Sequence, residues 1–262
     1  MLDLIDPAVI GGSLAGILFF GILVALGLGR WIGKRIIARH GPSAAGIGSL
    51  ETAVFALLGL IIAFTFAGAL SRFDTRRAQI VDEANAIGTA YLRIQLVPAS
   101  VQPKLRETFR SYVDSRIETY RRLPDIAAAN AEIARTEELQ AEVWSQAVAA
   151  VRMPGTPPMA ELLVLPAFNE VFNFITIRSS ATLMHPPLVV YAMLIGLAFA
   201  SALLAGYQTA GERAYDWMHQ VGFAGIVALT VYVILDIEYP RLGFVRLDAM
   251  DQVMVNVRQG MK

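Results

Sequence analysis

Three arginines just after an apolar segment are the side chains best suited to act on a ligand. Arg72, Arg76 and Arg77 follow about twenty uncharged residues. A ring of arginines around a symmetry axis favours negative ions, so these residues could draw anions into a vestibule. Alternatively, they could anchor a helix among lipid headgroups, partly neutralised by nearby carboxylates. Those carboxylates belong to Asp74, Asp82 and Glu83.

The other polar side chains suggest no catalytic or metal-binding arrangement. His40, His185 and His219 are far apart, and none has a second ligand three or four residues away. The chain has no cysteine, and it has neither a nucleotide-binding glycine motif nor a nucleophile elbow. We therefore expect structural histidines, no cofactor, no bound metal and no enzymatic activity.

Charge and hydropathy restrict the class of protein further. The formal net charge is zero, so the composition does not favour a nucleic-acid partner. Hydrophobic residues make up 55% of the chain, charged residues make up 17%, and the mean hydropathy is +0.52. This composition is too apolar for an ordinary soluble domain and too charged for a protein lying wholly within a membrane.

Four uncharged blocks have the length that a helix needs to cross a bilayer. They comprise residues 8–29, 52–71, 188–207 and 217–235. The N-terminus is acidic instead of basic, so we expect the first block to remain as a span and not to be a cleaved signal peptide. Its Gly12-x-x-x-Gly16 pattern predicts the close approach of another helix. Asp236 closes the fourth block.

The region between the second and third spans is charged and has helical periodicity. Its predicted helices, most of them bounded by prolines, cover residues 72–97, 101–122, 126–152 and 159–181. No alternating pattern long enough for a β-strand interrupts them. The expected fold is therefore an all-α integral membrane protein, with four transmembrane helices and a helical extramembrane domain inserted between spans 2 and 3.

The domain boundaries expected from these segments are as follows. Residues 1–71 hold transmembrane helices 1 and 2, and residues 72–181 form the helical extramembrane domain. Residues 182–238 hold transmembrane helices 3 and 4, and residues 239–262 form a turn and a short amphipathic helix.

Two short motifs carry a resemblance to a known family. The segment AFTFAGALSRFDTRR resembles the bestrophin signature after the second span, with Phe64, Arg72 and Arg77 on its phenylalanine and two arginines. The segment IEYPRLG resembles a bestrophin element that follows the last span. Its matching residues are Ile237, Glu238, Pro240 and Gly243. In layout, the whole chain resembles the bacterial membrane proteins that carry a bestrophin-like domain.

The resemblance implies a function and an assembly. Bestrophins are homopentameric anion channels, permeable to chloride, whose second span lines an apolar neck. Carried over, Phe64 would be the lower neck residue, with Leu60 and Ala56 one and two turns above it. The expected partners are lipid, further copies of the chain and anions, and the expected location is the bacterial inner membrane. The alternative is a non-conducting sensor or scaffold whose helical domain binds a partner.

The side of the membrane on which the inserted domain lies is left open by two conflicting arguments. The bestrophin resemblance implies a cytosolic domain. By the positive-inside rule, the basic connection from Arg30 to Arg39 would be cytoplasmic. Because the second span separates this connection from the inserted domain, the domain would then lie in the periplasm.

Overall fold

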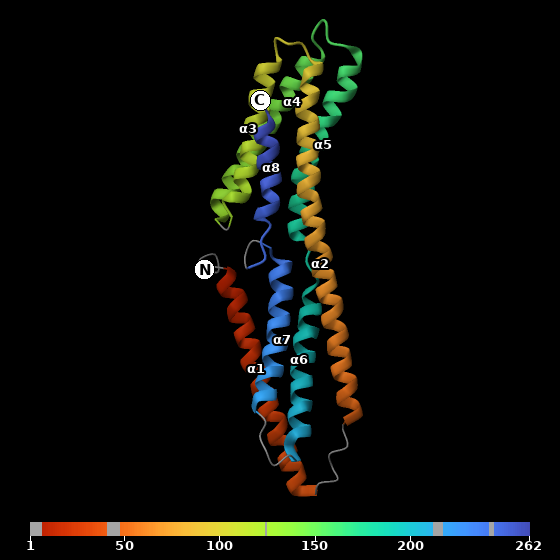
Figure 1. Ribbon diagram of the computed structural model, residues 1–262, viewed down its shortest axis with the longest axis vertical. Helices are drawn as coiled ribbons and strands as arrows, with labels where there is room; N and C mark the ends of the chain where they lie inside the picture. Colours follow the sequence, from red (N-terminus) through yellow and green to blue (C-terminus); the bar gives the residue numbers. More distant parts are fainter. Residues whose placement is uncertain (1–6, 41–47, 124, 212–216, 241–243) are drawn as a thin grey trace. The chain divides into compact units, whose positions relative to one another are not determined.

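The computed structural model describes residues 7–40, 48–123, 125–211, 217–240 and 244–262, and these residues fold into helices without any β-strand. The elements in chain order are α1 (Pro7–His40), α2 (Gly48–Arg93), the short 3₁₀ helix η2 (Ile94–Leu96), α3 (Gln102–Arg121), α4 (Ile126–Val151), α5 (Pro158–Leu183), α6 (Leu188–Gln208), the 3₁₀ helix η3 (Thr209–Gly211), α7 (Trp217–Glu238) and α8 (Asp248–Gly260). The prediction of an all-α fold is confirmed (Figure 1).

Four candidate membrane spans are present among the described residues. They cover Gly12–Arg39, Glu51–Leu96, Pro158–Gly211 and Trp217–Glu238, each with a strongly apolar stretch. The third of these ranges contains two helices, because α5 ends at Leu183 and α6 begins at Leu188. The predicted third span corresponds to α6. The fourth span is longer than expected, since α7 continues past Asp236 to Glu238.

Prolines and one aspartate account for several helix boundaries. Pro103 and Pro158 lie in the first turns of α3 and α5, where a missing backbone N–H costs nothing. At the start of α4 the Asp125 carboxylate accepts a hydrogen bond of 2.9 Å from the Ala128 backbone N–H. The sequence predicted a helix that ends at residue 97. α2 ends earlier, at Arg93, because the last residues tighten into η2.

The chain divides into two compact units. Unit 1 comprises residues 1–73 and 185–245, and unit 2 comprises residues 74–184 and 246–262. α2 is one continuous helix that contributes its first part to unit 1 and its second part to unit 2.

Unit 1 contains α1, the first part of α2, α6 and α7, which run side by side (Figure 1). α1 packs most extensively against α6 and α7. The apolar core of this unit includes the fully or almost fully buried side chains of Leu18, Ile22, Leu26, Leu58, Leu194 and Val231. A second small cluster joins α2 to the end of α7 through Ala69, Ile234 and Ile237.

Two glycines allow α1 and α6 to touch backbone to backbone. A Cβ atom on Gly29 would lie 2.0 Å from the Leu203 carbonyl oxygen, and one on Gly206 would lie 2.0 Å from the Leu26 carbonyl oxygen. Only a hydrogen fits in such a gap, so small residues let the helices approach closely in an apolar medium. By contrast, nothing in the described chain lies within 4 Å of a Cβ built on Gly12 or Gly16. The close approach therefore lies further along α1 than predicted.

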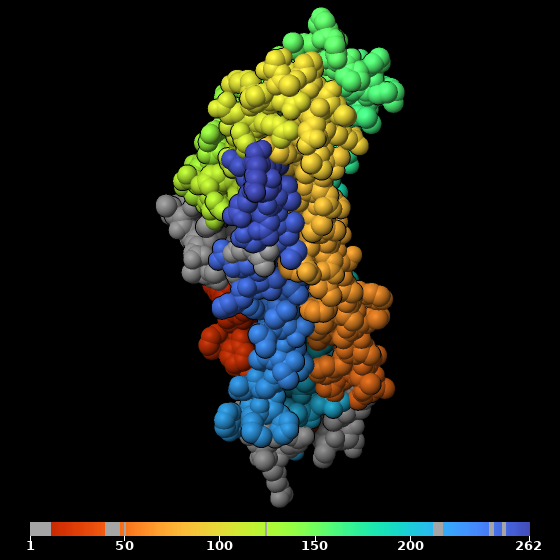
Figure 2. Space-filling model, turned by 45° about the horizontal axis from the view of Figure 1, so that its top comes forward, coloured from red at the N-terminus to blue at the C-terminus, as the bar shows by residue number. Residues whose placement is uncertain are grey.

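Unit 2 contains the second part of α2 with α3, α4, α5 and α8. α3 packs mainly against α4, and an aromatic core of buried rings joins α3 to α5. The Phe109 ring meets the Phe168 ring edge to face, with centroids 5.1 Å apart. α8, dark blue in Figure 2, lies at the surface of this unit and is tied to α3 by an ion pair of 2.7 Å between Arg258 and Asp114.

Candidate functional site

The three candidate neck residues lie on one uncovered face of α2. Ala56, Leu60 and Phe64 are four residues apart and so share one side of the helix. All three are exposed, Leu60 at 50% and Phe64 at 66%. On another side of the same helix, Leu58 is almost completely buried in the core of unit 1. The described part of the chain therefore leaves these three apolar side chains, the α2 stripe, largely uncovered.

The two motif segments meet at the end of the spans. Arg72, directly after the predicted second span, donates to the carboxylate of Glu238, the last residue of α7, through two nitrogens. The Nε–Oε1 distance is 2.9 Å and the Nη2–Oε2 distance is 2.7 Å. Glu238 is fully buried, so its charge requires such a partner. Sequence reasoning singled out both residues, left Arg72 either in an anion vestibule or as a headgroup anchor, and did not predict the pair.

His185 joins this ion pair from the connection between α5 and α6. Its Nδ1 lies 3.1 Å from Oε1 of Glu238, and its ring stacks on Tyr239 with centroids 4.5 Å apart. The sequence suggested only a structural role for this histidine. No signal in the sequence indicated the contact, because His185 and Glu238 lie 53 residues apart.

A turn containing Pro240 of the second motif follows α7. Asp236 accepts hydrogen bonds from the backbone N–H groups of Phe244, at 3.0 Å, and Val245, at 2.9 Å. Pro240 lies in the turn that follows Glu238. Gly243, the last candidate of this motif, lies outside the described residues. Asp236 was expected to close the fourth span, and it instead holds the returning chain against the last turn of α7.

Arg76 and Arg77 have different environments in unit 2. Arg76 is buried and donates to the carbonyl oxygens of Ala181, at 3.3 Å, and Met184, at 3.2 Å, at the end of α5. Arg77 is exposed, and its Nη1 lies 3.4 Å from Oδ1 of Asp74, one turn earlier in α2. Of the three arginines proposed for a vestibule, Arg72 and Arg76 are therefore held in place by acceptors outside α2.

A buried carboxylate in unit 2 was also misassigned by sequence reasoning. Glu83, which lies beyond the predicted second span, was expected to neutralise the arginines near residue 72. It is instead fully buried between Arg116 and Arg178, with an Oε1–Nη2 distance of 2.7 Å to Arg116. Burial by itself would raise the pKa of Glu83, but the two guanidinium charges hold that pKa below its usual value. The cluster fastens α2, α3 and α5 to one another.

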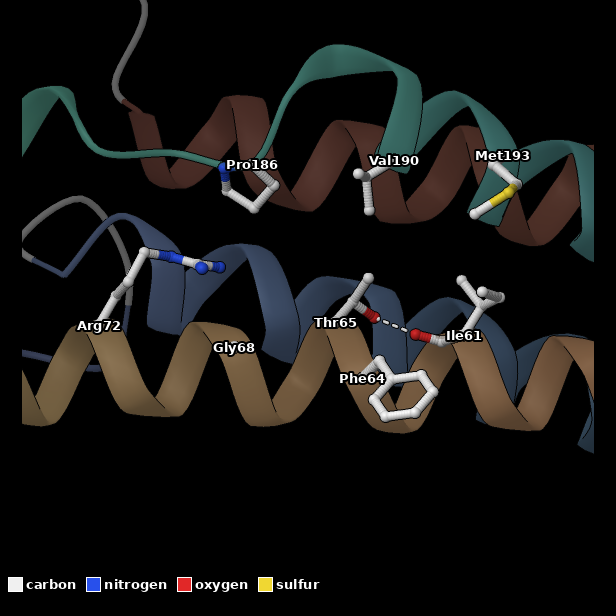
Figure 3. A pocket seen from close by; sticks show the side chains of 8 residues that line it. All are labelled: Ile61, Phe64, Thr65, Gly68, Arg72, Pro186, Val190 and Met193. Carbon is white, nitrogen blue, oxygen red and sulfur yellow. Dashed lines mark hydrogen bonds between the residues drawn. The ribbon is translucent and has the colours of Figure 1, made fainter.

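A small pocket opens between α2 and α6 within unit 1. Its volume is about 180 Å³. The lining residues are Ile61, Phe64, Thr65, Gly68, Arg72, Pro186, Val190 and Met193. Figure 3 shows Arg72, Thr65 and Ile61 on the side of α2 that faces α6, whereas the Phe64 ring is turned away. Within the described part of the chain, no three histidine or acidic side chains are grouped as a metal site.

Comparison with known proteins assigns the family. Residues 18–249 match the model of the family described as bestrophin-like domain. Two crystal structures of a bacterial bestrophin homologue from Klebsiella pneumoniae have a similar fold. The variant with one tryptophan changed to alanine is 14% identical with a TM-score of 0.70, covering 95% of this chain and 98% of the homologue. The variant with one tyrosine changed to alanine is 15% identical with a TM-score of 0.59, covering 93% and 98%.

The family model and the two crystal structures each match most of the chain. No curated protein matches the sequence significantly. The structural likeness runs over nearly the full length of both chains, at an identity that establishes the fold alone. The family model covers most of the sequence, from the first span to the residues after the second motif. The chain is therefore a membrane protein with the bestrophin fold, and it belongs to the bestrophin-like domain family.

Proposed function

We propose that the protein is an oligomeric anion channel whose neck is lined by the α2 stripe. The observation that carries this proposal is the uncovered position of Ala56, Leu60 and Phe64 on one face of a span. In one chain the described residues leave this face half or more exposed at Leu60 and Phe64, while copies arranged around an axis would bring their stripes together. The bestrophin fold supports the proposal, because the family resemblance implies a pentamer with the second span at its axis.

Such a neck could conduct anions without any charged residue in its wall. The edge of an aromatic ring carries partial positive charge, so a ring of Phe64 edges favours a partly dehydrated anion such as chloride. The apolar wall formed by Leu60 and Ala56 can also shut the path by dewetting. Because Arg72 is paired with Glu238, it contributes mainly to the position of α2, and the exposed Arg77 is the better vestibule candidate.

The proposed arrangement in the cell follows the sequence-based boundaries. Unit 1 would lie in the bacterial inner membrane, and residues 72–181 would form the extramembrane domain. Unit 2 supports this placement, because charged side chains such as Lys104, Arg121 and Arg135 are exposed on it. The protein would act as a channel and not as an enzyme, in line with its family.

Flux measurements on purified protein in liposomes test the function. We expect a chloride flux that rises several-fold in Phe64→Ala, because removing the ring widens the neck and weakens dewetting. Phe20→Ala is a matched control, since Phe20 has the same 66% exposure but lies on α1. The flux of the control should equal that of the unchanged protein.

Two results would decide against this function. A confirmed oligomer that passes no anion would favour the alternative, a non-conducting sensor or scaffold whose helical domain binds a partner. If Phe64→Ala and Phe20→Ala changed the chloride flux equally, the α2 stripe would not line the ion path.

A further inference from the structure

The pocket between α2 and α6 is polar at one end and apolar along the rest of its length. Arg72 is at one end, directly after the uncharged block that forms the predicted second span. From there α2 contributes Gly68, then Thr65, then Ile61, and the antiparallel α6 contributes Val190 and Met193 (Figure 3). The Thr65 hydroxyl donates to the carbonyl oxygens of Ile61 and Ile62 and so offers no free donor to the pocket. The pocket therefore has one cationic end and is otherwise apolar.

At the cationic end, one nitrogen of the Arg72 guanidinium has no acceptor among the described residues. Arg72 uses Nε and Nη2 for Glu238, whereas its Nη1 makes no hydrogen bond to any residue in the described part of the chain. The side chain is 29% exposed, while Glu238 is fully buried on its other side. A guanidinium nitrogen at the edge of a membrane needs an acceptor, and anions satisfy it best.

Gly68 keeps the space beside that nitrogen open. A Cβ atom at this position would lie 3.3 Å from Nη1 and 3.5 Å from Nη2 of Arg72. Any larger side chain would therefore fill the cationic end of the pocket. Gly59 on the same helix has nothing within 4 Å of its Cβ position, so it has no comparable packing reason to be glycine.

We propose that this pocket binds an anionic phospholipid of the surrounding bilayer. The phosphate would accept hydrogen bonds from Nη1 of Arg72, and part of one acyl chain would lie along Thr65, Ile61, Val190 and Met193. Arg72 is at the end of a span, the depth at which lipid phosphates lie. The pocket is also smaller than the roughly 300–1,000 Å³ of sites for compact ligands, so it suits one stretch of a slender chain.

Photolabelling in proteoliposomes tests this binding without requiring any ion flux. The protein is placed in phosphatidylcholine vesicles containing a minor fraction of phosphatidylglycerol that carries a diazirine on one acyl chain. Labelled residues are then mapped by mass spectrometry. We expect Val190 and Met193 to label more strongly than Phe20 and Leu229, which are exposed on α1 and α7. Unlabelled phosphatidylglycerol should compete, and unlabelled phosphatidylcholine at the same concentration should not.

A pair of glycine variants provides the structural control. Gly68→Leu should lower the labelling of Val190 and Met193 about tenfold, the loss expected when one charge-assisted contact is removed. Gly59→Leu should leave it unchanged. If Gly68→Leu alters the elution profile of the protein, Val190→Trp fills the same pocket from α6 and should remove the labelling of Met193.

Several outcomes would overturn the proposal. Labelling of Met193 no stronger than that of Leu229 would indicate ordinary contact with bulk lipid. Competition by oleate but not by phosphatidylglycerol would assign the pocket to a free fatty acid. Crosslinks from a Met193 photoprobe to a second copy would assign it to the oligomer interface. Each result is independent of whether the protein conducts anions.

Discussion

Glu238 is the residue of unit 1 at which Arg72 and His185 converge. It accepts hydrogen bonds from Arg72, lies within hydrogen-bonding distance of His185 and is itself fully buried. Removing one member of a fully buried ion pair usually costs about 3–5 kcal/mol, because the other charge is left without a partner, and the cost is lower here because Arg72 is 29% exposed. Replacing both members costs much less. The pair should therefore show strong energetic coupling.

A double-mutant cycle tests the energetic coupling between Arg72 and Glu238. We expect Arg72→Gln and Glu238→Gln each to lower the unfolding temperature in detergent, and the double variant to be less destabilised than the sum of the two. Arg77→Gln is the control, because an exposed pair with Asp74 contributes at most about 1 kcal/mol. Additive effects of the two single changes would show that Arg72 and Glu238 do not interact in solution.

The buried carboxylate of Glu83 gives a pH dependence with a defined sign. Its pKa is lower in the folded protein than the usual value of 4.5, so ionised Glu83 stabilises unit 2 above pH 4.5. That stabilisation is lost as the pH falls from 4.5 through the lower folded-state pKa. Acid unfolding followed by circular dichroism should therefore lose part of its pH dependence in Glu83→Gln. The exposed Glu138→Gln should behave like the unchanged protein.

The partners of the buried charged residues could not be predicted from the sequence. The motifs identified Arg72 and Glu238 as important, but a motif records positions and not partners 166 residues apart. Glu83 was assigned to the nearest arginines along the chain, whereas it pairs with Arg116 and Arg178 from other helices. Charge pairing of buried groups depends on packing that the local sequence does not encode.

Helix positions, by contrast, were predictable from the sequence. Prolines and runs of apolar residues placed α3, α4, α5 and α6 within about two residues of their observed ends. The contact between α1 and α6 was not predictable, because α1 contains several glycines and α6 contains two, and only the folded structure shows which of them meet. Gly29 and Gly206 lie in the contact, whereas no neighbouring described segment comes within 4 Å of a Cβ built on Gly12 or Gly16.

The glycine contact predicts a difference between two substitutions on one helix. Gly206→Ala should destabilise the protein by about 1–3 kcal/mol, because the new methyl group would overlap the Leu26 carbonyl oxygen and push the helices apart. Gly196→Ala, with nothing within 4 Å of its Cβ position, should be neutral or slightly stabilising. Thermal unfolding of both variants in detergent measures the difference. Equal unfolding temperatures would contradict the close approach of α1 and α6.

The assembly of whole molecules can be examined by engineered disulfides, because the chain contains no cysteine. We expect Phe64→Cys to form disulfide-linked dimers on mild oxidation, since copies that share a neck bring the α2 stripes within bonding distance. Phe20→Cys, equally exposed on α1, should remain monomeric on a non-reducing gel. Crosslinking of Phe20→Cys alone would place α1 at the contact between copies.

The contact of Gly29 and Gly206 also has a consequence for biosynthesis. α1 leaves the ribosome early, but the helix against which it packs most closely is completed about 180 residues later. At translation rates of roughly 5–20 residues per second, α1 waits roughly 10–40 seconds in the membrane without its main neighbour. During that interval the first span is open to membrane proteases and to insertion factors. Slow translation of the central region should therefore reduce the yield of intact protein, even though that region belongs to the other compact unit.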